Sequence, residues 1–340
     1  MFPTSELRAK SLADVLAAIA LTVGFRPVNS VVVAALRPSG SLGMIASLDL
    51  DSVTPESADL IAVHAANDRA DRALVIVYGE DQVVAADVVG AMTCALHGQA
   101  VDVAQAAHVD QTTYRDLLVD DAPAQPLSDI ETSAVAAHAV AMGRNLHATR
   151  ADLLPAPVAQ WAQTVARRVH DAQITKDDQT THAIATWRLM LAGLAGGPKI
   201  AGEMAARLTD ARVRDAVLLT MIPGVPDDVV ARVVEGGQGH ADNEAVARAI
   251  AAIVDPDQAC EPGHAARDGA DALAQIVAHV PDSAPAWTLW ALLAWWTGNG
   301  LAAQDALDHA GQGYRLADLL RQALAQGIPP GWVRKHRNDG

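Results

Sequence analysis

The stretch "LTVGFRPVNSVVVAAL" (residues 21–36) decides how the first part of the chain folds. A helical pattern of apolar residues ends in it at Gly24, and an apolar, β-branched run begins after Ser30. A strand that is apolar on both faces belongs in the middle of a sheet that is covered on both sides. The stretch therefore predicts a helix, a connector and a central strand.

The connector, residues 24–30, has two interpretations. In the first it is a bend, because Gly24 supplies the positive φ that ends a helix and Pro27 fixes the direction in which the chain leaves. In the second, Arg26, Ser30 and free backbone N–H groups hold a phosphate or a carboxylate. The negative end of a helix dipole disfavours an anion there, so the bend is the favoured interpretation.

The sequence around this stretch predicts an α/β domain over residues 1–120. Residues 42–50 follow a tight turn and are expected to form a hairpin with the first strand. Further strands are predicted at 72–79 and 100–109, the last one as a half-exposed or edge strand, and helical patterns separate them. Strands that are joined through helices imply parallel crossovers, and we expect a mixed sheet.

The amino-acid composition changes at residues 121–128, where prolines and acidic residues indicate a linker. Residues 129–340 contain no convincing strand, and we predict an all-α helical domain. Near its end, "APAWTLWALLAWWTGNGLAAQDALDHA" (284–310) has the helix-turn-helix spacing of one tetratricopeptide unit. We therefore expect a tetratricopeptide-like helix pair in the C-terminal part.

Charge and cysteine content limit the classes of partner. The formal net charge is −15, from 40 acidic and 25 basic residues, and such a surface repels nucleic acid and anionic membranes. The two cysteines have no metal-ligand spacing and are too few for a disulfide framework. With no signal peptide or membrane-spanning run recognised, we expect a cytoplasmic protein that binds neither nucleic acid nor membrane.

Acidic residues follow the predicted strands at their carboxyl ends, where ligands bind in open α/β sheets. Asp49 and Asp51 follow the second strand, and Glu80 and Asp81 follow the third. They could hold a divalent cation through oxygen ligands, or they could cap the next helices, which we favour. No nucleophile elbow and no metal-ligand pair of histidines is recognised, so we predict no resident metal and no cofactor, and we assign no catalytic residue.

Four tryptophans lie close together in the C-terminal part: Trp287, Trp290, Trp295 and Trp296. Their helix is apolar all round, so it is either buried on every side or offered to a partner. Tryptophan is enriched at interaction hot spots, which keeps the second interpretation open, although core packing is the favoured one.

The opening stretch also resembles a known family. In "SLADVLAAIALTVGFRPVNSVVV" (11–33), Asp14, Gly24, Phe25, Pro27 and Ser30 match the pattern of an actinobacterial family catalogued as domain of unknown function 4192. "RALVIVYG" (72–79) is similar too, and the resemblance extends over nearly the whole chain. It implies a shared fold and supplies no reaction, cofactor or partner.

Two functional hypotheses remain, from different classes. The first is a non-catalytic interaction or scaffold protein that binds a protein partner or a second copy of itself through its helical domain. The second is an enzyme acting on a small molecule or a nucleotide phosphate with a divalent cation at the acidic sheet edge. The absence of a recognisable catalytic set favours the first.

Overall fold

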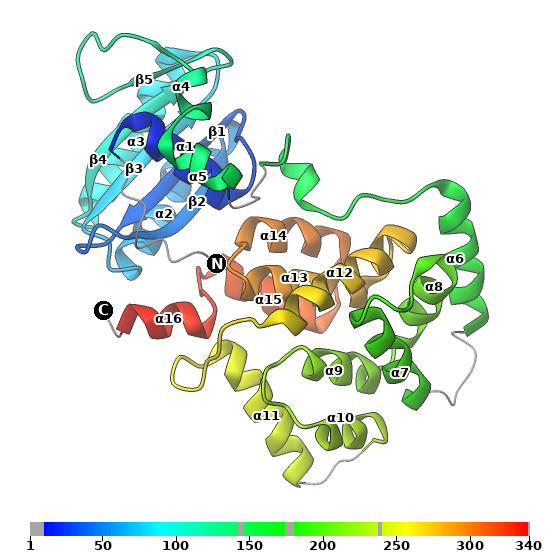
Figure 1. Ribbon diagram of the computed structural model, residues 1–340. Helices are drawn as coiled ribbons and strands as arrows, with labels where there is room; N and C mark the ends of the chain where they lie inside the picture. The colour runs from blue at the N-terminus through cyan, green and yellow to red at the C-terminus, as the bar shows by residue number, and fades with distance from the viewer. Residues whose placement is uncertain (1–9, 142–145, 174–179, 237–239, 339–340) are drawn as a thin grey trace. The chain divides into compact units, whose positions relative to one another are not determined.

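The computed structural model describes residues 10–141, 146–173, 180–236 and 240–338 (Figure 1). The chain divides into two compact units, Met1–Leu153 and Leu154–Gly340. All strands of the described residues lie in the first unit, and the described part of the second unit is helical. This confirms the prediction of an α/β part followed by a helical part.

The first unit is built on one six-stranded sheet. Its strands are β1 (Ser30–Leu36), β2 (Leu42–Asp49), β3 (Arg72–Tyr78), β4 (Asp102–Val109), β5 (Thr113–Asp116) and β6 (Gln125–Pro126). Its helices are α1 (Leu12–Val23), η1 (Leu50–Ser52), α2 (Pro55–Asn67), α3 (Gln82–Gly98), α4 (Ser128–Glu131), α5 (Ala134–Ala141) and η2 (Arg150–Leu153).

The sheet is mixed, as predicted, with strand order β2-β1-β3-β4-β5-β6. Strand β1 pairs antiparallel with both β2 and β3, so β2 and β3 run in the same direction and the chain between them crosses β1 through α2. Strands β3 and β4 pair in parallel and are connected through α3. The expected hairpin and the expected crossovers are therefore both present.

Strand β4 is half-exposed, which was one of the two predicted alternatives, and it is not the edge strand that the other alternative predicted. It pairs with β5 on its free side, and β5 pairs in turn with β6. The predicted linker, residues 121–128, contains β6, and α4 and α5 then pack against α1. The first compact unit consequently extends to Leu153, beyond the boundary expected at residue 120.

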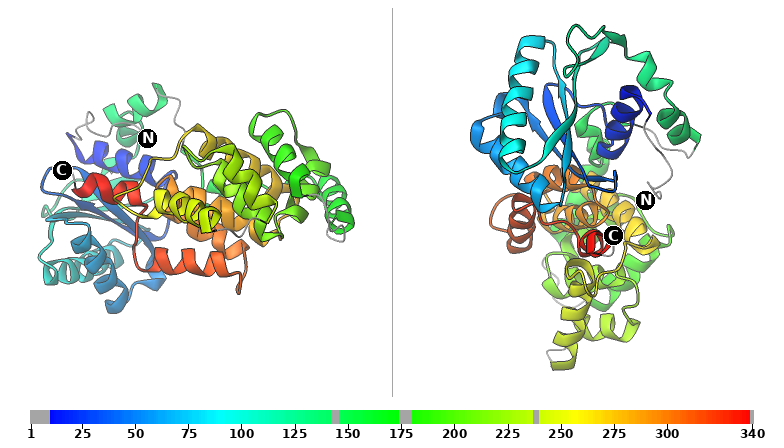
Figure 2. Two further views of the ribbon diagram at one scale, coloured as in Figure 1. Left: turned by 90° about the horizontal axis from the view of Figure 1, so that it is seen from below. Right: turned by 90° about the vertical axis from the view of Figure 1, so that its left-hand side faces the viewer.

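Helices cover both faces of the sheet. Helices α2 and α3 pack on one face through small and β-branched residues such as Ala62, Ala65 and Val88. Helices α1 and α5 lie on the opposite side (Figure 2). Covered on both faces, the β1 residues from Val31 to Ala35 are fully buried, as the continuous apolar run predicted.

Side-chain caps position the helices at the ends of the strands. The Ser11 hydroxyl accepts a hydrogen bond from the Asp14 N–H and begins α1, and Gly24 ends it with a φ of 95°. Thr54 and Ser57 form a capping box at the start of α2. Ser128 has the spacing of a cap but lies inside α4, whose N-cap residue is Leu127 and makes no side-chain cap.

The second unit is a packed array of helices. They are α6 (Gln160–Gln173), α7 (Thr180–Leu191), α8 (Gly197–Arg207), α9 (Ala211–Thr220), α10 (Asp227–Val234), α11 (His240–Val254), α12 (His264–His279), α13 (Ala284–Trp296), α14 (Gly300–His309), α15 (Arg315–Ala325) and α16 (Gly331–Asn338). Helices α6 and α8 approach closely at Gly202, where an added Cβ would lie 2.1 Å from the carbonyl oxygen of Ala166. Small side chains therefore set the spacing of these helices.

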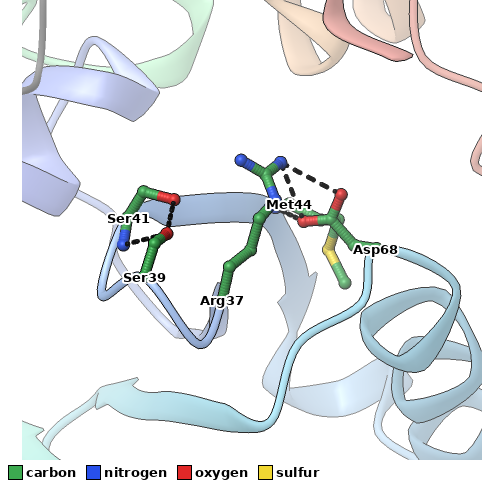
Figure 3. A network of polar contacts seen from close by, with 5 residues as sticks. All are labelled: Arg37, Ser39, Ser41, Met44 and Asp68. Carbon is green, nitrogen blue, oxygen red and sulfur yellow. Dashed lines mark hydrogen bonds and ion pairs between the residues drawn. The ribbon is translucent and has the colours of Figure 1, made fainter. Parts of the chain in front are cut away.

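A buried carboxylate fixes the β1–β2 hairpin to the end of α2 (Figure 3). The Asp68 oxygens accept hydrogen bonds from Nη2 of Arg37, at 3.2 and 3.3 Å, and from the backbone N–H of Met44, at 2.6 Å. Asp68 is almost fully buried. A Cβ at Gly43 would lie 2.0 Å from its Oδ2, so only glycine fits beside this carboxylate.

We expect the Asp68→Ala variant to lose about 3 kcal/mol of unfolding free energy, because hydrogen bonds to a buried charged group are removed and Arg37 loses its counterion. Urea titration followed by circular dichroism measures the change. Asp71→Ala removes a half-exposed carboxylate from the same connection and should cost less than about 0.5 kcal/mol. Equal losses for the two variants would contradict the anchoring role of Asp68.

Candidate functional site

The carboxyl ends of β2, β3 and β4 meet the beginning of β1 at one edge of the sheet. Ser30 is paired with Asp49 on one side and with Tyr78 on the other. Residues directly opposite each other in neighbouring strands point to the same face. Asp49, Ser30 and Tyr78 therefore form a row on one face, and we call them the edge row. Ser30 and Asp49, two of the predicted site residues, are therefore neighbours in the edge row. Tyr78 was not among the predicted site residues.

The connector that precedes β1 is a bend with an ion pair. Phe25 is buried, and Asn29 adopts a φ of 46° just before the strand. Arg26 donates a hydrogen bond from Nη2 to Oε1 of Glu131 in α4, at 3.1 Å. The cation that would hold an external anion is thus already paired with a carboxylate of the same unit.

Two polar side chains are buried at this edge. Burial raises the pKa of Tyr78 well above its usual value, and the nearby Arg26 opposes the shift only in part, so the phenol stays protonated. His108 donates from Nε2 to the carbonyl oxygen of Gly79 at 2.7 Å, which joins the ends of β3 and β4. Both residues stabilise the sheet end, and neither pairs with an activating base among the described residues.

The predicted acids do not converge at this edge. Asp81 caps α3, and its Oδ1 accepts hydrogen bonds from the N–H groups of Val83 and Val84. Asp49, Asp51 and Glu80 are exposed. Among the residues that the structure describes, no three His, Cys, Asp or Glu side chains gather as a metal site requires.

A further acid, Asp110, organises the turn between β4 and β5. Its carboxylate accepts hydrogen bonds from the backbone N–H and hydroxyl groups of both Thr112 and Thr113, at 2.7 to 3.1 Å. Partial burial would raise the pKa of Asp110, but these hydrogen bonds outweigh burial and lower it to about 2. Its charge is therefore used to hold a turn.

The four tryptophans lie in the core of the second unit or at its border. Trp287, Trp295 and Trp296 are buried, and each donates its indole N–H to a backbone carbonyl of the same unit. The acceptors are Pro281 at 2.7 Å, Ile328 at 3.0 Å and Cys260 at 3.3 Å, respectively. Trp290 is half-buried and contacts Trp287 edge to face. These contacts match the core interpretation, and the three buried indoles are not presented to a partner.

Two apolar hollows flank α10, and neither is predicted by the sequence patterns. The first, of about 330 Å³, lies between the α9–α10 connection and α11, and we call it the Arg248 hollow. Its lining residues are Ile222, Pro223, Gly224, Val225, Pro226, Val229, Arg248, Ala249 and Ala252. The second, of about 210 Å³, lies between α7 and α10, and we call it the Arg188 hollow. Its lining residues are Ile184, Ala185, Arg188, Asp227, Val230, Ala231, Val234 and Glu235.

The signal that could have located these hollows is weak. Pro223 and Pro226 bracket a rigid connection before α10. Whether such residues leave a hollow depends on how neighbouring helices pack, which periodicity alone does not contain.

An α/β unit followed by a helical unit defines the class of the protein. The chain belongs to the family described as "Domain of unknown function (DUF4192)", whose model matches residues 13–331. Comparison with the curated proteins and comparison with the solved structures found no match. Within the described residues, no helix has the length and apolar character needed to cross a membrane.

We expect Trp296→Ala to lower the unfolding free energy by about 3–5 kcal/mol, because a fully buried indole is removed from the core. Urea titration followed by circular dichroism provides the measurement. Trp161→Ala, on the exposed surface of α6, is the matched control and should change it by less than about 0.5 kcal/mol. An unfolding curve for Trp296→Ala that coincides with that of the parent would rule out the core role.

Proposed function

We propose that the chain is a non-catalytic protein-interaction protein and that its helical unit provides the binding surface. The observation that carries the proposal is the pair of apolar hollows on the two sides of α10. Interfaces combine an apolar centre with a polar rim. The Arg188 hollow has this composition, and the Arg248 hollow combines apolar residues with one arginine.

The Arg188 hollow illustrates this composition. Its floor contains Ile184, Val230 and Val234, which are buried. At its rim Arg188 donates a hydrogen bond to Asp227 at 2.6 Å. Leu189, one helical turn after Ala185, adds an exposed apolar side chain on α7. An apolar side chain of a partner would fit between the two helices.

The size of the hollows favours a protein partner over a small substrate. Pockets for small molecules have about 300–1,000 Å³ and enclose most of the ligand. The Arg188 hollow is smaller than this range, and the Arg248 hollow is at its lower end with an exposed rim at Pro223 and Pro226. Such hollows suit side chains that project from another protein.

Helices α13 and α14 have a supporting role in this proposal. The likeness of this helix pair to a tetratricopeptide unit remains a hypothesis. In the proposal, the pair forms the framework of the helical unit, and α10 is the element that binds the partner. The partner is either a different protein or a second copy of this chain. Both cysteines are free, which is compatible with the reducing cytoplasm that we propose as the compartment.

Affinity purification of the full chain from its native host, with quantitative mass spectrometry, tests the proposal. Ala185→Glu and Ala231→Glu place carboxylates on the exposed rim of the Arg188 hollow. We expect at least one co-purifying protein, or the chain itself, to be retained more than about tenfold less by these variants, because a carboxylate would lose water against an apolar partner.

The matched control is Ala325→Glu, which makes the same change at an exposed position at the end of α15. It should retain the partner at the level of the parent. Light scattering on the purified chain separates self-association from binding of another protein. Identical co-purifying proteins for all variants, with a monomeric parent, would contradict the proposed function.

A further inference from the structure

The Arg248 hollow combines apolar walls with a single charge. Arg248 is exposed on α11, and every other residue that lines the hollow is uncharged. Its guanidinium makes no hydrogen bond or ion pair with any residue that the structure describes. By contrast, Arg188 of the neighbouring hollow is already paired with Asp227.

The walls of the Arg248 hollow are arranged before any partner binds. The α9–α10 connection carries Pro223 and Pro226, and a proline ring fixes φ and limits the freedom of the chain. Val229 and Ala249 are buried in the helices on either side. A partner that enters such a hollow loses little affinity to ordering of the receptor.

The positive charge of Arg248 in this hollow is opposite in sign to the net charge of the chain. With a formal net charge of −15, most of the surface repels acidic partners, whereas an unpaired guanidinium beside apolar walls attracts a carboxylate. Guanidinium and carboxylate groups match in geometry and form charge-assisted hydrogen bonds. An apolar side chain adjacent to a carboxylate would complement both features.

We propose that the Arg248 hollow binds a peptide segment of a partner protein in which an acidic residue lies next to an apolar one. The carboxylate pairs with Arg248, and the apolar side chain fills the space between Val225, Val229 and Ala252. This rests on the proposed interaction function and specifies the chemistry of the partner segment.

A random peptide library displayed on phage, selected against the full chain, tests the inference. The selected peptides should carry Asp or Glu next to Leu, Ile, Val or Phe. For the peptide selected most strongly, made with a fluorescent label, fluorescence anisotropy measures the affinity. Arg248→Gln should weaken its binding about fivefold at low salt, as for one exposed ion pair, and the difference should shrink in high salt.

The control is Arg315→Gln, which removes the same charge from an exposed position on α15 and should leave the affinity unchanged. Exchange of the peptide's acid for its amide should weaken binding to the parent about fivefold and leave binding to Arg248→Gln unchanged, since the two changes remove the same ion pair. Selected peptides without acids, equal effects of Arg248→Gln and Arg315→Gln, or no selected peptide at all would overturn the inference. If a partner sensitive to Ala231→Glu is still captured, the proposed function stands and only the inference fails.

Discussion

Strand β1 is hydrogen-bonded on both sides and covered on both faces, and the arrangement of the first unit depends on it. Because it runs antiparallel to both neighbours, β2 and β3 have to reach their places by a crossover through α2. Its beginning, Ser30, therefore lies where the carboxyl ends of β2, β3 and β4 meet. Its far end continues into the hairpin that Asp68 anchors through Arg37 and Met44.

Several charged groups at this edge of the sheet have partners within the first unit. The charged groups there stabilise the fold locally, since Arg26 pairs with Glu131, Asp81 caps α3 and Asp110 holds the β4–β5 turn. Catalysis needs convergent groups that keep some freedom to bind a substrate. In the helical unit the situation is reversed, because the hollows beside α10 leave apolar surface and one guanidinium without partners among the described residues.

Sequence patterns identified the elements whose signals are local. The run after Ser30, the cap at Asp81 and the terminating glycine at Gly24 are each encoded within a few residues. Strands β5 and β6 are only four and two residues long and follow no sequence pattern of their own. They are defined by pairing, β5 with β4 and β6 with β5. The hollows beside α10 depend on packing between helices that are far apart in the sequence, which explains why they were not predicted.

Partner binding is thus proposed for the surface around α10, whereas the sheet edge contributes to stability. Hydrogen exchange of the full chain, measured with and without its captured partner, compares these two places most directly. We predict slower exchange in residues 184–188, 222–235 and 248–252 in the complex, and unchanged exchange in residues 26–30, 49–51 and 79–81. Protection at the sheet edge, with none around α10, would contradict this assignment.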